Sequence, residues 1–172
     1  TIAVFIASVI EVPYRSLGAI SQPHISQAVK DNDIAEVNKL CKSVSLHQLL
    51  VGGFVFIVIW INIDFIFAVI PNGSVYESGK WVVFFLGITK LVYSTLNVGI
   101  TVLSFSKYYY NSLIFTIVLT VTAIVFNILF IPQWGMTGAA FATLLSNVIY
   151  YVLMLGYNKI RIKTSPFSYT QI

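Results

Sequence analysis

Residues 44–70 read VSLHQLLVGGFVFIVIWINIDFIFAVI, and this apolar run decides the class of the fold. A helix needs roughly 20 apolar residues to cross the hydrocarbon core of a bilayer, and the run exceeds that length. Pro71-Asn72-Gly73-Ser74, four residues that favour a turn, follow it directly. The run therefore predicts a transmembrane helix.

The rest of the chain repeats this pattern. Further apolar runs occupy about residues 2–27, 81–104, 113–131 and 136–157. Hydrophobic residues make up 58% of the chain and charged residues 9%, with a mean hydropathy of +0.87, whereas soluble domains carry about 25% charged residues. We therefore predict an all-α, polytopic integral membrane protein, with five transmembrane helices in a single domain over residues 1–172.

A polar segment at about 28–43 separates the first two runs. Asp31-Asn32-Asp33 can cap a short helix there, with Ile34, Val37 and Leu40 on its apolar side. This pattern predicts an amphipathic linker on the membrane surface. The first run is longer than the apolar core of a signal peptide, so we expect the chain to be a fragment of a longer protein.

The basic residues predict the orientation in the membrane. The loop on the opposite side carries only Lys80, whereas the linker, the loop after the third span and the tail carry Lys30, Lys39, Lys42, Lys107, Lys159, Arg161 and Lys163. By the positive-inside rule this second set faces the cytoplasm. None of these residues forms the basic patch typical of nucleic-acid binding, so no nucleic-acid partner is expected.

Charged residues inside the predicted spans are the candidate functional groups. Each costs about 2.5 to 3.5 kcal/mol at the bilayer centre, so a charge kept there marks a pathway or a buried pair. Glu11 and Arg15 lie four residues apart and can pair on one helix face, which Gln22 continues. The third span carries a polar stripe at helical spacing: Lys90, Ser94, Asn97, Thr101 and Ser104. The two stripes predict a shared hydrated space, and the alternative is a structural ion pair with Glu11.

Other polar residues in the spans fit structural roles. Asp64 lies near the outward end of the second span, where the interface can hydrate it. The fourth span carries a stripe that favours hydrogen bonds between helices: Ser112, Thr116, Thr120 and Asn127. His24, His47 and the single Cys41 lack the spacing of metal ligands, and the chain has no HExxH, GxSxG or phosphate-binding glycine loop. We therefore expect no enzyme, no metal and no other cofactor.

Two segments carry a more specific pattern. The first is VPYRSL at 12–17, which leads into QPHIS at 22–26 and the acidic linker DNDIAEV at 31–37. The second is IPQWGMTGAAFAT at 131–143, where the small residues Gly138, Ala142 and Ser146 predict a smooth face for close helix packing. Together the segments resemble the oligosaccharide flippases of the MATE-like (MOP) superfamily, known as polysaccharide biosynthesis proteins. The resemblance covers essentially the whole chain.

The resemblance implies a fold and a function. Family members have two six-helix lobes around a cavity, and this chain is similar to the second lobe without its first helix, so the remaining helices of the same protein are expected partners. It implies that a polyprenyl-diphosphate-linked glycan is flipped across the bacterial inner (plasma) membrane by alternating access. Arg15 and Lys90 would then bind the diphosphate, and Gln22 and Asn97 the glycan hydroxyls. Glu11 would hold Arg15 or take up a proton.

Other classes of function stay open at this point. An ion-coupled MATE-type exporter of small molecules would place acidic groups in its cavity, whereas two cations favour an anionic substrate. A membrane-embedded glycan-processing enzyme needs catalytic groups on a substantial loop, and the outward loops at 71–80 and 132–135 are short. A structural membrane module has no need of charges aligned on two helices.

Overall fold

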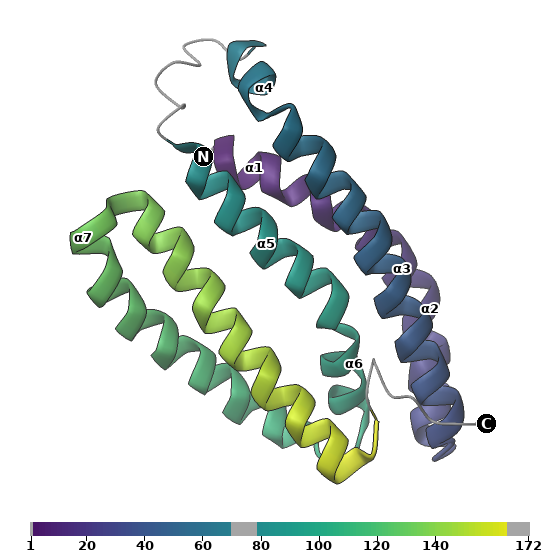
Figure 1. The fold of residues 1–172 in the computed structure, drawn as a ribbon. Coiled ribbons are helices and arrows are strands. Elements are labelled where there is room, and N and C mark those ends of the chain that lie inside the picture. The colour runs from purple at the N-terminus through teal and green to yellow at the C-terminus, as the bar shows by residue number, and fades with distance from the viewer. Residues whose placement is uncertain (1, 70–78, 165–172) are drawn as a thin grey trace.

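The computed structural model describes residues 2–69 and 79–164, and within these ranges the chain forms only helices and turns (Figure 1). In chain order the elements are α1 (Ile2–Ser8), the 3-10 turn η1 (Val9–Glu11), α2 (Val12–Lys30), α3 (Ile34–Ile61), α4 (Ile63–Val69), α5 (Lys80–Leu96), α6 (Val98–Phe105), α7 (Tyr109–Tyr157) and the π-helical turn η4 (Asn158–Ile162). Three of these helices, with α1 to α2 taken as one, are long and apolar enough to cross a membrane, and the bent pair of α5 and α6 gives a fourth. The described chain is therefore all-helical, with helices suited to a bilayer, and the number of five spans stays a prediction.

Pro13 shapes the first of these helices. A proline has no N–H, so Pro13 cannot donate a hydrogen bond to the carbonyl of Val9. The helix tightens into η1 just before it, where the N–H of Val12 bonds to that same carbonyl. The tightened turn places Glu11 at the junction between η1 and α2.

The polar segment after α2 differs from the predicted layout. Asp33 does cap a helix, because its carboxylate accepts a hydrogen bond from the N–H of Glu36 at 2.9 Å. That helix is α3, however, and it continues without a break to Ile61. The prediction of a separate surface linker over 28–43 is therefore wrong for this structure.

The reason lies in the buried face of α3. Val37 and Cys41 are almost fully buried and belong to one core cluster with Ile25 of α2 and Val102 of α6. The apolar side of the supposed linker therefore packs on protein instead of lipid headgroups. Because no proline or glycine interrupts residues 34–51, the helix has no reason to end before the apolar run begins.

An ion pair joins α4 to the start of α5. Lys80 Nζ lies 2.7 and 2.8 Å from the two carboxylate oxygens of Asp64, and 5.7 Å from the centre of the Trp60 ring. Trp60 in turn contacts Trp81 and Phe84. Aromatic rings beside an exposed ion pair are typical of a membrane interface, and the interfacial position of Asp64 stays a prediction.

The third predicted span is bent. α5 ends at Leu96, α6 begins at Val98, and the two axes differ by 43°. Asn97 stands at the bend, and its carbonyl accepts hydrogen bonds from the N–H groups of Ile100 and Thr101. The predicted third span over 81–104 thus consists of two helices that meet at Asn97.

α7 is a helical hairpin. A straight helix of its 49 residues would extend about 74 Å, more than twice the thickness of a bilayer core. Gly135 reverses the chain with φ 54° and ψ −129°, a conformation that glycine adopts far more readily than other residues. Figure 1 shows the two arms, residues 109–134 in green and 136–157 in light green to yellow, side by side. These arms match the fourth and fifth predicted spans in position.

The second arm depends on small residues. Gly138 is buried, and a Cβ there would clash with the carbonyl of Phe130, coming within 2.6 Å of its carbon. Ala142 and Ser146 are fully buried further along the same face. The smooth face predicted from these spacings therefore does face the protein interior.

The bent pair of α5 and α6 occupies the centre of the bundle. α2 and α3 pack on one side of it and the α7 hairpin on the other (Figure 1). The outer sides carry exposed apolar residues at helical spacing, namely Leu50, Phe54, Ile57 and Ile61 on α3 and Leu113, Ile117, Val121, Ile124 and Ile128 on the first arm of α7. Such continuous apolar faces suit contact with lipid.

Candidate functional site

The charged residues predicted in the first and third spans meet in the structure. Glu11 ends η1, and Lys90 lies ten residues into α5, about 15 Å from its start. α5 packs directly on α1 and η1. The packing of these elements brings together two side chains that are far apart in the sequence.

One carboxylate is shared by two cations. Lys90 Nζ lies 2.8 Å from Oε1 of Glu11, and Arg15 Nη2 lies 3.7 Å from Oε2. Glu11 is buried at 8% exposure, whereas the Arg15 side chain is 74% exposed and that of Lys90 is 29% exposed. Lys90 is thus the close partner of the buried acid, and the Arg15 guanidinium is held only loosely. We name this group of three residues the charge triad.

Two aromatic residues connect the triad to the bend in the third span. The Asn97 amide donates a hydrogen bond to the hydroxyl of Tyr14, which ties α2 to the junction of α5 and α6. Tyr14 also meets the edge of the Tyr93 ring, with centroids 5.7 Å apart. Sequence reasoning missed both tyrosines, although each stands three residues after a triad member, Glu11 or Lys90, and so shares its helix face.

The lower part of the first polar stripe lies apart from this group. Gln22 is exposed two helical turns beyond Arg15, and no hydrogen bond links it to the triad within the described ranges. On α5, Ser94 is buried, and its hydroxyl bonds to the carbonyl of Leu91 on its own helix. Of the predicted site residues, Glu11, Arg15 and Lys90 are in contact, Asn97 is linked through Tyr14, and Gln22 is separate.

A second polar cluster lies between α3 and α5. The Ser45 hydroxyl donates to the carbonyl of Thr95 at 2.8 Å. Gln48, one turn further along α3, is fully buried, and neither its nitrogen nor its oxygen has a hydrogen-bond partner among the described residues. An unbonded buried amide costs about 1 to 3 kcal/mol. Sequence reasoning missed this cluster because it carries no charge.

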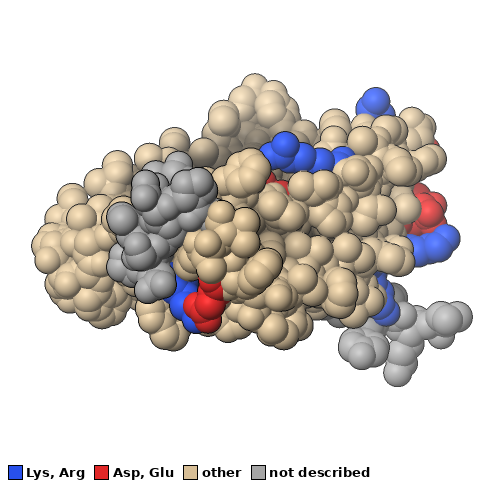
Figure 2. Space-filling view, turned by 90° about the horizontal axis from the view of Figure 1, so that it is seen from above, with Lys and Arg blue, Asp and Glu red and all other residues tan. Residues whose placement is uncertain are grey.

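Charge is sparse elsewhere on the bundle. Viewed from above, most of the surface in Figure 2 is uncharged, and each acidic patch in view has basic atoms beside it. In residues 2–69 and 79–164, no three His, Cys, Asp or Glu side chains are grouped to hold a metal ion. The charge triad is therefore the strongest candidate site within the spans.

Comparisons with known proteins do not add an identity. No protein-family model, no curated protein and no solved structure matches the chain. The chemistry of the charge triad and its surroundings therefore carries the argument about function.

Proposed function

We propose that the chain is part of a membrane transporter that flips an anionic, lipid-linked oligosaccharide across the bacterial inner membrane by alternating access. The observation that supports this most is the sharing of buried Glu11 by Lys90 and Arg15. Two cations and one acid leave the triad with a surplus positive charge inside apolar helices. Charged residues kept within membrane spans are candidates for substrate pathways.

The two cations have different roles in this proposal. Lys90 neutralises Glu11 at 2.8 Å and fixes its position. Arg15 keeps most of its side chain exposed, so its planar fork can meet the diphosphate that links the glycan to its polyprenyl carrier. Asn97 and Gln22 offer amide groups to the glycan hydroxyls.

The bend at Asn97 supports a moving part near the site. Discontinuous helices near the bilayer midplane are typical of transporter binding sites, because their free backbone groups can face substrate or ions. Here the bend is joined to the triad helix through the hydrogen bond between Asn97 and Tyr14. In this proposal the remaining helices of a longer protein complete the cavity and rock against this lobe.

One observation favours a second candidate, an ion-coupled exporter of small molecules. Glu11 is a buried acid, and a buried acid that loses its cation can take up a proton or bind a cationic substrate. The surplus positive charge of the triad argues for the anionic substrate. Transport assays with both substrate classes separate the two candidates.

The decisive variant is Arg15→Ala in the full-length protein. Glycan export is expected to be lost, while the amount of protein in the membrane stays near that of the wild type, because the Arg15 side chain is largely exposed. Arg15→Lys should restore export only in part, since lysine keeps the charge but lacks the fork. Lys39→Ala is the matched control, because Lys39 is also exposed and paired within its own helix, to Glu36.

The double variant Glu11→Ala with Arg15→Ala separates substrate binding from ion-pair structure. Recovery of both abundance and export would refute the substrate role of Arg15. Normal abundance without export would support it. Undiminished export in Arg15→Ala alone would refute the proposal directly.

A further inference from the structure

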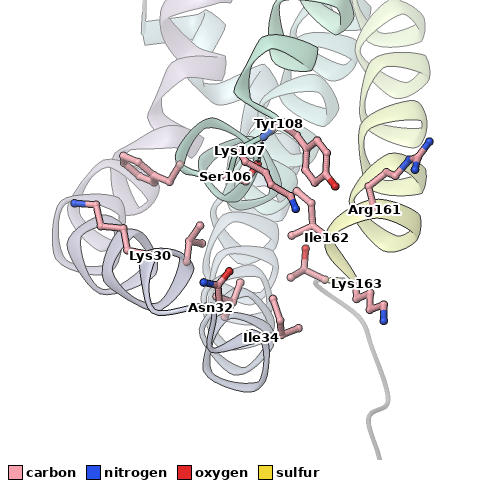
Figure 3. Close-up of a pocket in the computed structure, with 13 residues that line it drawn as sticks. Lys30, Asn32, Ile34, Ser106, Lys107, Tyr108, Arg161, Ile162 and Lys163 are labelled. Carbon is pink, nitrogen blue, oxygen red and sulfur yellow. Dashed lines mark hydrogen bonds between the residues drawn. The ribbon is translucent and has the colours of Figure 1, made fainter.

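A cavity of about 430 Å³ lies at the end of the bundle away from α4 (Figures 1 and 3). Three chain segments enclose it: the junction of α2 and α3, the connection between α6 and α7, and the turn after η4. Its volume falls in the range of small-molecule sites. The charge triad contributes no residue to its lining, so the cavity is a separate feature.

The lining of this cavity is strongly basic. It includes Lys30, Lys107, Arg161 and Lys163 and no acidic residue. Across the described ranges, none of these four forms an ion pair. Four like charges around one space repel each other, and an anion between them would remove that repulsion.

Lys107 is the cation best placed to meet such an anion. Figure 3 shows its amine pointing into the space between the segments, near the Tyr108 ring, whereas Lys30 and Arg161 extend outward on either side. Its Nζ lies 5.2 Å from the centre of that ring. Lys107 directly precedes the N-terminal end of α7, which carries partial positive charge and disfavours a cation. The dipole of α7 therefore does not account for this lysine.

The backbone of the cavity is also unusual. Asn32 and Lys163 both line it, with φ of 55° and 60°, and they are the non-glycine residues with positive φ in the described ranges. Asparagine tolerates this conformation, but for lysine it costs roughly 1 to 2 kcal/mol. Glycine is the common residue at the end of a helix. The position after η4 instead carries a cation on the rim of the cavity.

The walls of the cavity indicate the kind of anion. Ile34, Phe105 and Ile162 supply apolar surface beside the basic groups, which an inorganic ion does not need. The positive-inside asymmetry puts this end of the bundle at the cytoplasmic leaflet, where anionic lipids gather around juxtamembrane basic groups. We propose that the cavity binds the phosphate of an anionic phospholipid headgroup, with Lys107 as the central contact. This proposal does not depend on the substrate of the transporter.

Lipid titration of the full chain tests the proposal. The chain is purified in an uncharged detergent, and its thermal unfolding midpoint is followed against short-chain phosphatidylglycerol, short-chain phosphatidylcholine or inorganic phosphate. Phosphatidylglycerol is expected to raise the midpoint in a saturable way, and the other two are expected to leave it unchanged, because a ligand stabilises only the state that it binds.

Charge-matched variants locate the effect. Lys107→Gln should weaken phosphatidylglycerol binding about tenfold, the loss expected for one charged hydrogen bond, while Lys107→Arg should retain it. Lys159→Gln is the control, because Lys159 is exposed on η4 and lies outside the cavity lining. If Lys107→Gln does not fold, Lys163→Gln on the rim serves in its place and is expected to weaken binding in the same direction.

Three results would overturn the proposal. Equal weakening by Lys107→Gln and Lys159→Gln would show that general surface charge attracts the lipid. An equal shift with inorganic phosphate would show a site for the free ion. The absence of any shift would show that the cations serve only to neutralise the C-terminal ends of α2, α6 and η4.

Discussion

α5 and the first arm of α7 both carry polar residues at helical spacing, yet the two stripes behave differently. On α5, Lys90 reaches Glu11 and Asn97 reaches Tyr14, so the stripe joins separate helices. On the first arm of α7, Thr120 and Asn127 donate to the carbonyls of Thr116 and Ala123 on their own helix. These two residues therefore do not make the predicted hydrogen bonds between helices within the described part of the chain.

The difference shows which polar side chains can find their hydrogen-bond partners on their own helix. A threonine hydroxyl or an asparagine amide can bond to the carbonyl four residues earlier, and it then needs no partner on another helix. A charged group cannot be satisfied in this way, so Lys90 requires an acid from elsewhere. Polar spacing alone thus identifies a helix face without showing whether it meets another helix, whereas a charge within a span calls for a partner of opposite charge.

Removal of the Lys90 charge should have the largest effect on stability. Lys90→Met leaves Glu11 buried with only the looser Arg15 as a partner, and a broken buried pair costs about 3 to 5 kcal/mol. The free energy of unfolding in mixed detergent micelles measures the loss. The double variant Glu11→Gln with Lys90→Met should recover most of it, and wild-type stability of the single variant would mean that the pair is hydrated.

A methyl group added at Gly138 should cause the second-largest loss of stability. Gly138→Ala would push a Cβ into the Phe130 carbonyl, where backbone has to move, and overpacking of this kind costs about 1 to 3 kcal/mol. It tests whether close backbone contact holds the α7 arms together in place of polar bonds. Gly156→Ala on the same arm is the control, because a Cβ added there would meet nothing within 4 Å. Equal stability of both variants would contradict this interpretation.

The bond between Asn97 and Tyr14 should have a smaller effect. A double-mutant cycle of Asn97→Leu and Tyr14→Phe should give a coupling energy of about 0.6 kcal/mol and at most about 1.7 kcal/mol, as measured for hydrogen bonds between membrane helices. The coupling energy is obtained from the free energies of unfolding of the wild type, the two single variants and the double variant. A coupling near zero would mean that this bond, like the hydrogen bonds within the first arm of α7, does not hold two helices together.

Thr120→Val should have the smallest effect of the set. The hydroxyl is exposed and bonds only within its helix at 2.9 Å, so the change in unfolding free energy should stay within about 0.5 kcal/mol. The same micelle assay measures it. A loss above about 1 kcal/mol would mean that the first arm of α7 meets another helix at this face.

The sequence predicted the local features of the fold best. The turn at Gly135 follows from glycine after an apolar run, and the pairing of Glu11 with Arg15 follows from helical spacing of four residues. That Lys90 lies closer to Glu11 than Arg15 does could not be predicted in this way, because helical spacing gives a face but not the depth at which another helix places its charge. The bend at Asn97 also left no signal in the sequence, since neither proline nor glycine stands at that position.

The short reversal at Gly135 also bears on how α7 enters the membrane. A ribosome adds roughly 5 to 20 residues each second, so the second arm, residues 136–157, follows the first within about 1 to 5 s. No stretch of chain between the arms is long enough to fold on the far side of the bilayer. We therefore expect the two arms to enter the lipid together as one hairpin, with Gly135 at its leading end.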